Sequence, residues 1–309
     1  MLNHFPIRLV NKEMEQLGFW EVKTSPKVTN VSAVTHRSPF RYPGGKTWFV
    51  PRVRRWLKWL GYKPAKFIEP FAGGAITGLT VAFENLAETV VLVEKDEQVA
   101  AVWQTIINAQ DGAEWLANEI VNFNLTLDSA NLVLSSAPAS TKELAFKTII
   151  QNRISHGGIL ADGAGLIKNG ENGKGILSRW YPKTLKRRIL DISQIKERIQ
   201  FHKGDAFKTI EKYSLDSNAV FFIDPPYTAS RKKAGTRLYK YHQLDHEKLF
   251  DVMSKVKGDF LMTYDNADEV RGLALKHRFE TRLVAMSNTH HAIMMELLIG
   301  RDLSWVDKS

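Results

Sequence analysis

Cysteine is absent from the 309 residues of the chain. This excludes disulfide bonds and zinc sites built from thiolates. Long apolar runs are also missing, since no stretch approaches the roughly 20 apolar residues that span a bilayer. The first residues, MLNHFPIRLVNKEMEQLGFW, lack a long apolar stretch followed by a small-residue cleavage site. We therefore expect a cytoplasmic protein with no membrane span and no secretion signal.

The sequence also offers little that would hold a metal ion. His290 and His291 stand together before the last predicted strand. No cluster of carboxylates accompanies them, so roles other than metal binding explain both histidines more simply. We expect no metal site.

Carboxylates are scarce in three segments that are rich in Lys and Arg. The net charge is +10, from 43 basic and 33 acidic residues. Eight basic residues lie in 41–66 and five in 231–240, with no carboxylate in either segment. Seven more lie in 168–188, beside the single Glu171. A charge run is often only a solvated surface, but three together favour a polyanionic partner such as nucleic acid.

Strands and helices alternate through much of the chain from residue 40 onward. Helical periodicity is found at 48–60, 78–87 and 97–109. The apolar runs typical of buried strands lie at 66–70, 89–94, 198–205, 219–227, 258–265 and 290–300. The order of strand, glycine-rich turn, helix and strand is typical of a parallel sheet with right-handed crossovers. The sequence therefore predicts an α/β fold.

This alternation lapses between residues 112 and 198. Helices are predicted there at 113–123 and 142–154, around a segment with seven glycines between residues 157 and 175. The simplest interpretation is one α/β domain, formed by 38–111 and 199–309, interrupted by a mostly helical domain at 112–198. Residues 1–37 lack a clear period and are expected to form an appendage.

A glycine-rich loop follows the first predicted strand. Phe71-Ala-Gly-Gly-Ala ends that strand and opens a helix, and Glu94 ends the next strand, twenty residues after Gly74. Glycines let the backbone approach a ligand closely, and a carboxylate at this distance can accept hydrogen bonds from ribose hydroxyls. NAD, FAD and S-adenosylmethionine would each fit, and a plain tight turn is the simpler alternative.

The motif Asp224-Pro-Pro-Tyr227 follows the apolar strand AVFFI. It is therefore expected at the carboxyl end of a sheet strand, where α/β folds bind ligands. Pro225 and Pro226 fix φ and remove two backbone donors, which leaves carbonyl acceptors in a rigid loop. Asp224 and the Pro225 carbonyl could each accept one N–H of an amino group on a base. Tyr227 would offer an aromatic face on which an extruded base can stack.

With these motifs in this order, residues 38 to 300 resemble the Dam-like, D12-class adenine-N6 DNA methyltransferases. RYPGGK is similar to the opening motif of that family, EPFAGGA to its cofactor loop, and FIDPPY to its catalytic tetrapeptide. The order of cofactor motif, recognition insertion and catalytic motif resembles the α group of these enzymes. The resemblance implies a Rossmann-like S-adenosylmethionine-dependent methyltransferase sheet with an inserted, mostly helical DNA-recognition domain.

The resemblance also implies roles for single residues. Tyr42, where the family often has Trp, and Lys46 would contact the cofactor, with Lys46 holding the methionine carboxylate. Glu94 would bind the ribose, for which Asp96 is an alternative, while Asp205 would contact the adenine or only cap a helix. The expected cofactor-binding residues are Tyr42, Lys46, Phe71, Gly73, Glu94, Asp205 and Asp224, with Phe207 as a further pocket residue. The expected catalytic residues are Asp224, Pro225, Pro226 and Tyr227.

The implied activity is site-specific transfer of a methyl group from S-adenosyl-L-methionine to N6 of adenine in double-stranded DNA, by base flipping and without metal. Such an enzyme would work in a bacterial cell or a phage-infected host, for example in restriction-modification. Methylation of cytosine N4 follows the same logic, but serine more often leads the motif there. The sequence also leaves open an RNA substrate, a catalytically silent DNA-binding protein and a nicotinamide-dependent oxidoreductase.

DNA would be read by the inserted segment and by the basic segments beside the motifs. Residues on a predicted helix near the end of the insertion are expected to contact phosphates, and residues of the glycine-rich segment to read bases. Asn152 and Arg153 resemble a family position near DNA. The expected DNA-binding residues are Asn152, Arg153, Lys168, Arg179, Lys183, Lys186, Arg187, Arg188, Arg231, Lys232 and Lys233, with Asn169 and Asn172 as further candidates.

Overall fold

The structure is a computed structural model that describes residues 24–25, 31–42, 44–161, 163–226, 244–287 and 293–306. Several residues that the sequence singles out lie outside these ranges. They are Tyr227, Arg231, Lys232, Lys233, His290 and His291.

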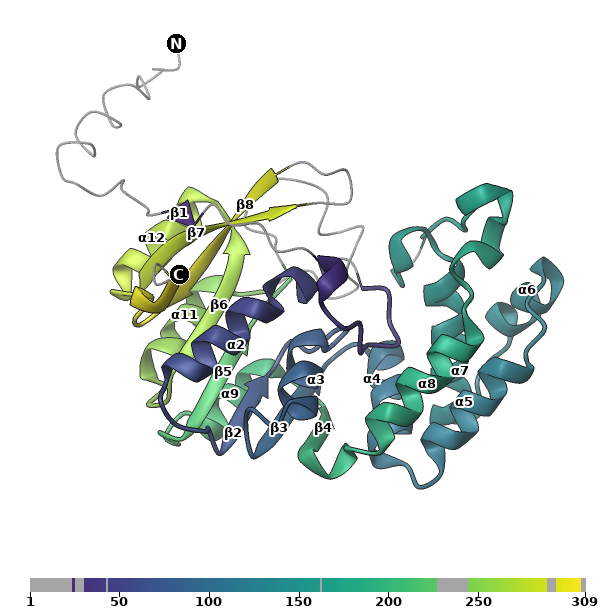
Figure 1. Ribbon diagram of the computed structural model, residues 1–309, viewed down its shortest axis with the longest axis horizontal. Helices are drawn as coiled ribbons and strands as arrows, with labels where there is room; N and C mark the ends of the chain where they lie inside the picture. Colours follow the sequence, from purple (N-terminus) through teal and green to yellow (C-terminus); the bar gives the residue numbers. More distant parts are fainter. Residues whose placement is uncertain are drawn as a thin grey trace, which may run out of the picture.

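An eight-stranded sheet forms the centre of the molecule (Figure 1). Its strands are β1 (Thr24–Ser25), β2 (Lys66–Glu69), β3 (Thr89–Glu94), β4 (Ile199–Lys203), β5 (Ala219–Ile223), β6 (Phe260–Asp265), β7 (Glu280–Ser287) and β8 (Ile293–Gly300). They follow the order β1-β7-β8-β6-β5-β2-β3-β4, and only β8 is antiparallel to its neighbours. Strands β4-β3-β2-β5-β6 give the 3-2-1-4-5 order of doubly wound folds. The predicted Rossmann-like α/β class is therefore confirmed.

The order of the strands reverses between β2 and β5, which lie side by side in parallel. Ligands of open α/β sheets bind at such a switch point, beyond the carboxyl ends of the strands. Two of the three sequence motifs that the family resemblance rests on lie there. EPFAGGA runs on from β2, and Asp224 directly follows β5.

Helices cover both faces of the sheet, so its central strands are buried on both sides. Helices α2 (Val50–Trp59), α3 (Ile76–Phe83) and α4 (Glu97–Trp103) pack on one face. Helices α9 (Ala206–Tyr213), α11 (His246–Lys255) and α12 (Asp268–Lys276) pack on the other. Strand β5 illustrates the result, because Phe222 joins the first core and Phe221 the second. This explains why its sequence is apolar throughout rather than alternating.

A helical segment lies beside the β4 edge of the sheet (Figure 1). It consists of α5 (Gly112–Asn122), α6 (Leu127–Ser135), α7 (Thr141–Ile154) and α8 (Pro182–Ser193). Its buried Leu116, Ile149 and Ile189 belong to the same hydrophobic cluster as Leu92 of β3 and Phe201 of β4. The segment is therefore continuous with the core of the sheet. No helix in the described part of the chain is long and apolar enough to cross a membrane.

The elements differ from the sequence expectation at several places. The helix predicted at 97–109 is α4 followed by a π-helical turn at Gln104–Asn108, which continues the same apolar face. Helix α3 begins and ends earlier than 78–87, because the glycine loop closes directly into it. Strand β7 was not predicted from its mixed sequence ETRLVAMS. The helix expected to carry Lys183 to Arg188 is confirmed as α8.

Candidate functional site

A cavity of about 790 Å³ lies at the carboxyl ends of β2, β3 and β5. This volume is within the range of small-molecule and cofactor sites. Many of the residues that the sequence singles out line this cavity. They are Tyr42, Lys46, Phe71, Gly73, Glu94, Asp96, Arg153, Arg188, Asp205, Phe207, Asp224, Pro225 and Pro226.

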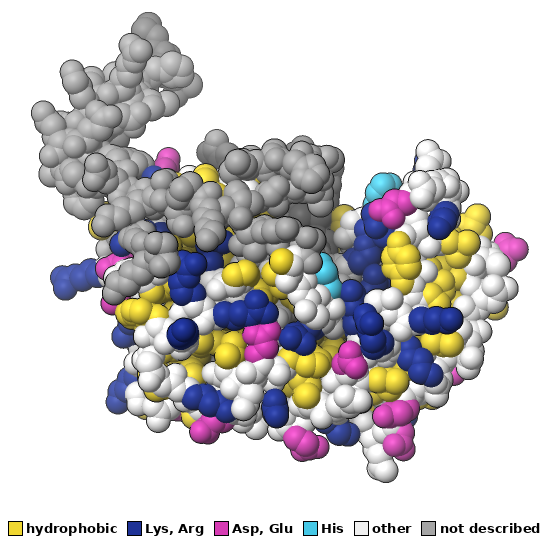
Figure 2. Space-filling view, in the orientation of Figure 1, with side chains coloured by type: hydrophobic (Ala, Val, Ile, Leu, Met, Phe, Trp, Pro, Cys, Tyr) yellow, Lys and Arg dark blue, Asp and Glu magenta, His cyan; other side chains and the backbone are white. Residues whose placement is uncertain are grey.

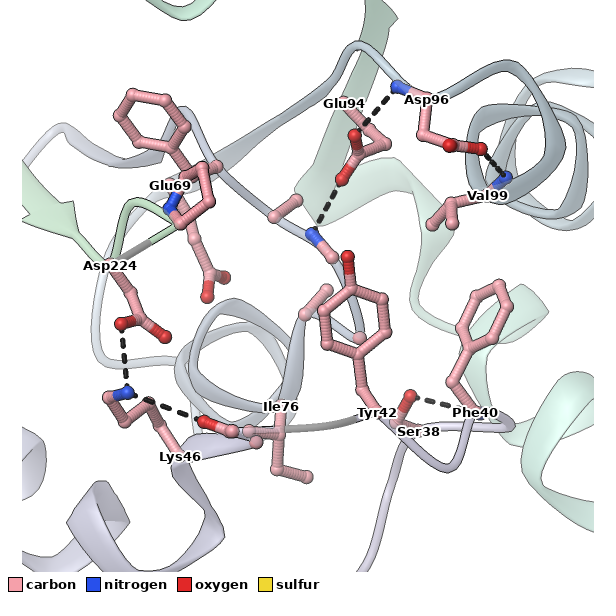
Figure 3. A pocket seen from close by; sticks show the side chains of 18 of the residues that line it. Ser38, Phe40, Tyr42, Lys46, Glu69, Ile76, Glu94, Asp96, Val99 and Asp224 are labelled. Atoms are coloured by element: carbon pink, nitrogen blue, oxygen red, sulfur yellow. Dashed lines mark hydrogen bonds and ion pairs between the residues drawn. The ribbon is translucent and has the colours of Figure 1, made fainter. Parts of the chain in front are cut away.

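The glycine loop is shaped by its contact with Tyr42. A Cβ added to Gly73 would lie 2.6 Å from Tyr42 Cε1, and one added to Gly74 would lie 2.9 Å from Tyr42 Cβ. Gly73 also has φ of +46°, a conformation that favours glycine. The Trp103 indole donates a hydrogen bond to the Gly73 carbonyl over 2.9 Å. The two glycines therefore let the loop approach Tyr42 closely, and Figure 3 shows the Tyr42 side chain among the residues of the cavity.

Glu94 lies at the end of β3 with both carboxylate oxygens engaged by backbone N–H groups. Gly73 N donates to one oxygen over 2.8 Å, and Lys95 N and Asp96 N donate to the other, each over 2.8 Å. Burial raises the pKa of Glu94 to about 7, although these three donors act in the opposite direction. Glu94 thus holds the glycine loop against β3 and titrates near neutral pH.

The two aspartates that border Glu94 in the cavity each cap a helix. Asp96 accepts hydrogen bonds from Gln98 N and Val99 N at the start of α4. Asp205 accepts from Phe207 N and Lys208 N at the start of α9, and its other oxygen lies 3.6 Å from Lys95 Nζ. The capping alternative for Asp205 is therefore present in the structure, and its carboxylate also lines the cavity.

Lys46 lies between two carboxylates from different strands. Its Nζ is 2.8 Å from Asp224 Oδ1 and 3.0 Å from Glu296 Oε1 on β8. The Lys46 ammonium also donates to the Gly44 carbonyl over 3.3 Å. Burial alone would lower the pKa of Lys46, but the attraction of the two carboxylates outweighs it and raises that pKa. Figure 3 shows the Lys46–Asp224 pair across the cavity from Glu94.

Two further strands contribute to the surroundings of Asp224. The Thr263 hydroxyl of β6 donates to Asp224 Oδ1 over 2.9 Å. Burial raises the pKa of Glu69, at the end of β2, well above its ordinary value, and the nearby Asp224 charge raises it further. Glu69 Oε2 accepts a hydrogen bond from Gly78 N of α3 over 2.8 Å. Asp224 therefore accepts from the Lys46 ammonium and the Thr263 hydroxyl. The raised pKa of the neighbouring Glu69 favours the protonated form of Glu69.

Three arginines lie together where the helical segment borders the cavity. Arg153 Nη2 donates to the Pro39 carbonyl, and Arg188 Nη1 donates to the Ser38 carbonyl over 3.1 Å. The Nε groups of Arg153 and Arg188 have no hydrogen-bond partner in the described part of the chain. Burial, with Arg188 and Arg41 nearby, lowers the pKa of Arg153 to about 9, so it remains charged at neutral pH. Figure 2 shows Lys and Arg side chains gathered in the hollow between the sheet and the helical segment.

Asn152 has a different place from the one expected of a DNA contact. It is fully buried, and its amide exchanges two hydrogen bonds with the backbone of Arg41, of 2.9 and 2.8 Å. A third hydrogen bond of 2.7 Å goes to the Gly158 carbonyl. Because nothing of this side chain reaches a surface here, a DNA contact through Asn152 must be corrected to a structural role. It joins α7 to the segment that carries Tyr42 and Lys46.

The other described residues expected to bind DNA lie outside the cavity on the helical segment. Lys168, Lys183 and Arg187 are exposed. Lys186 donates to Asn118 over 3.1 Å, and Arg179 pairs with Glu171 at 2.5 Å. Among the described residues, no group of His, Cys, Asp and Glu could hold a metal ion.

Sequence reasoning missed several residues that the structure brings to the site. Glu69 and Arg41 stand inside the quoted motifs EPFAGGA and RYPGGK, so a signal for both was available. Thr263 and Glu296 lie within apolar strands, where only the position of a polar residue on a buried strand could have marked them.

Comparison with known families finds a similarity over part of the chain. Residues 169–287 match the family model of the D12 class N6 adenine-specific DNA methyltransferases. The predicted resemblance is confirmed over this part of the chain. The part that matches this D12-class model contains Asp205 and the Asp224-Pro-Pro sequence, and it begins inside the helical segment. Among curated proteins, none matches the chain.

Two solved structures are distantly similar to this chain. A candidate RNA methyltransferase from Pyrococcus horikoshii, PH1948, is 11% identical with a TM-score of 0.36, covering 94% of this chain and 97% of its own. A candidate methylase from Haemophilus influenzae, HI0767, is 9% identical with a TM-score of 0.31, covering 81% and 88%. The Rossmann-like fold is established by the strand order itself.

Proposed function

We propose that the protein transfers a methyl group from S-adenosyl-L-methionine to N6 of adenine at specific sites in double-stranded DNA. The observation that carries this proposal is the place of Asp224-Pro-Pro. It stands at the switch point of a Rossmann-like sheet, in the same cavity as the glycine loop, and inside the segment that matches the D12-class family model.

The cavity fits a methyl donor of this kind. Its glycine loop leaves backbone exposed to the cavity, and Glu94 and Asp96 offer carboxylates for ribose hydroxyls. Asp205 and Phe207 offer an acceptor and an aromatic surface for an adenine ring. When bound, S-adenosyl-L-methionine supplies an electrophilic methyl group on a sulfonium centre.

The chain's own residues would orient and polarise the target amine. Asp224 and the Pro225 carbonyl each accept one N–H of the amine, which favours a pyramidal nitrogen with its lone pair turned toward the methyl donor. Pro225 and Pro226 present no backbone donor that would compete for the amine. Positioning and polarisation account for the rate acceleration, because the donor is already reactive. The proton lost after transfer leaves to Asp224 or to solvent.

For an extruded base to enter the cavity, the sugar-phosphate backbone of the duplex must lie at its mouth. Arg41 and Arg188 suit phosphate oxygens, because their charges are not matched by a carboxylate within ion-pair distance among the described residues. The buried Arg153 adds its positive charge to theirs. The exposed basic residues of α8 extend this surface along the helical segment. We assign that segment to phosphate contact and site recognition, and Tyr227 to stacking against the flipped base.

The test is to incubate the purified protein with S-adenosyl-L-methionine and mixed-sequence duplex DNA, and to identify methylated nucleosides by mass spectrometry. N6-methyladenine is expected, and it should be absent with the variant Asp224→Ala. N4-methylcytosine would change the target base. Methylation of RNA but not of DNA would change the substrate class. Cofactor and DNA binding without any methylated nucleoside would indicate a silent scaffold.

A further inference from the structure

The ammonium of Lys46 links β8 to the end of β5 near the proposed reaction centre. Lys46 and Glu296 are almost completely buried, with side chains 4% and 6% exposed, while Asp224 is 21% exposed toward the cavity. Lys46 contacts both carboxylates at 2.8 and 3.0 Å. Burying two charges is worthwhile for stability only when their geometry is good, and an apolar pair of similar volume often serves as well. The buried pair therefore calls for a reason beyond stability.

That reason lies in how Asp224 is held. The residue directly follows β5 and precedes two prolines, so its own backbone offers little to fix the carboxylate. Its Oδ1 is instead fixed from outside, by the Thr263 hydroxyl of β6 and by Lys46. Lys46 has a long flexible side chain, and a carboxylate on a paired strand is needed to keep its ammonium in place. Glu296 is such a residue, paired in the ladder with Asp265 of β6 and Val284 of β7.

We propose that Glu296 is a positioning residue for methyl transfer, acting through Lys46 to hold the Asp224 carboxylate correctly oriented toward the target amine. This inference rests on the proposed function and deepens it. It also changes the expected role of Lys46, whose ammonium is committed to Asp224 and Glu296 instead of to the methionine carboxylate of the cofactor.

The charge of Lys46 depends on the groups that face it. Asp224 of β5 and Glu296 of β8 contact it directly, and the buried Arg52 of α2 lies close enough to interact with Glu296. Glu69 of β2 and Tyr264 of β6 both interact with Asp224. Burial raises the pKa of Tyr264 above its ordinary value, so this phenol does not titrate below pH 10.

Glu296→Gln is the decisive variant, because it keeps the shape of the side chain and removes its charge. The kcat for methyl transfer should fall at least tenfold, while the KM for S-adenosyl-L-methionine stays within twofold. Removal of one of the two carboxylates that raise the pKa of Lys46 should lower that pKa, because burial then acts against Asp224 alone. An alkaline loss of activity should therefore begin at a lower pH in the variant than in the wild type.

Two further variants separate positioning from a merely structural role. Glu296→Asp keeps the charge and should recover more activity than Glu296→Gln. If the two variants lose activity equally, the carboxylate is not the cause and the inference is overturned. Glu247→Gln is the matched control, since Glu247 is exposed on α11 and pairs with Lys276 at 3.7 Å. It should leave both kcat and the pH profile unchanged.

A spectroscopic titration keeps the inference distinct from the proposed function. The pKa of Lys46 can be followed by NMR in lysine-labelled protein, with Lys46→Met to assign the signal, and it should be lower in Glu296→Gln than in the wild type. An unchanged pKa, or a wild-type kcat and pH profile in Glu296→Gln, would overturn the role of Glu296 and leave the methyltransferase proposal intact. A wild type that methylates no nucleic acid would instead remove the proposed function.

Discussion

At the scale of the residue, Asp224 carries the largest expected effect. Asp224→Ala should lower the rate of methyl transfer at least a hundredfold, since loss of one charged acceptor in the transition state costs about 3 kcal/mol or more. The fold should survive, because Lys46 keeps its ion pair with Glu296. Single-turnover kinetics and DNA-binding assays measure the two properties separately. Residual activity above about one hundredth of wild type would argue against the role of Asp224.

Glu94 gives a prediction about pH at the same scale. Its pKa of about 7 means that the carboxylate ionises as the pH rises through neutrality. The ionised form accepts ribose hydroxyls better, so the affinity for S-adenosyl-L-methionine should rise by up to roughly tenfold between pH 6 and pH 8. Calorimetric titration at both pH values measures this change.

The variant Glu94→Ala provides the control for that experiment. It should weaken cofactor binding by roughly 1.5–3 kcal/mol at pH 8, the usual worth of hydrogen bonds to a charged group. Its affinity should no longer depend on pH in this range. An unchanged affinity at pH 8 would move the ribose contact to Asp96.

At the scale of the element, Asn152 joins α7 to the segment before α2. Asn152→Ala would leave the N–H and carbonyl of Arg41 and the Gly158 carbonyl without these partners. We expect a loss of about 2–3 kcal/mol in the free energy of unfolding, measured by urea denaturation. Asn118→Ala, which removes an exposed hydrogen bond to Lys186, should change it by less than about 0.5 kcal/mol. Equal effects of the two variants would refute the joining role.

The segment 168–179 is the second element with a testable role. It contains two short 3₁₀ turns, Glu171–Gly173 and Gly175–Arg179, joined by the ion pair of Glu171 with Arg179. Replacement of the segment by a short linker should relax or erase the preference for a DNA site, while cofactor binding remains. Sequencing of methylated DNA from expressing cells measures the preference. Methylation of the same sites at the same rate would direct attention to residues 231–240 instead.

At the scale of the whole molecule, the charge of +10 predicts DNA binding that weakens steeply with salt. Neutralising Arg187 and Arg188 together should weaken binding on every sequence and lower the slope of log affinity against log salt by about 2. Arg187 is exposed and Arg188 lines the cavity, so only the Arg188 variant should also slow methyl transfer. Fluorescence titrations at several salt concentrations give the slopes.

The control for this experiment lies on the other side of the sheet. Arg271 belongs to α12, which packs in the second core, far in the fold from the helical segment. Arg271→Ala removes one positive charge, half of that removed in the double variant, and should leave the salt slope unchanged. If its slope fell by about half as much as that of the double variant, net charge would explain the effect and α8 would lose its assigned role.

The sequence by itself determined the class of the fold and the two motifs at its switch point. Helical and strand periods are local, and so are the restrictions that glycine and proline place on the backbone. For this reason the strands before EPFAGGA and DPPY were predicted at their correct places, and the basic helix near Arg187 was recognised as well. Strand β7, whose sequence has neither clear alternation nor an apolar run, was missed.

Only the tertiary structure decided which of these residues meet. Lys46, Asp224 and Glu296 come together because β8 inserts antiparallel between β6 and β7, and the pairing order of strands is not written in any local period. The same holds for Asn152, for which the family resemblance implied a DNA contact and whose burial makes it a joining residue. Burial and pairing arise from contacts between distant segments, and the pKa values near Glu94 and Lys46 follow from them.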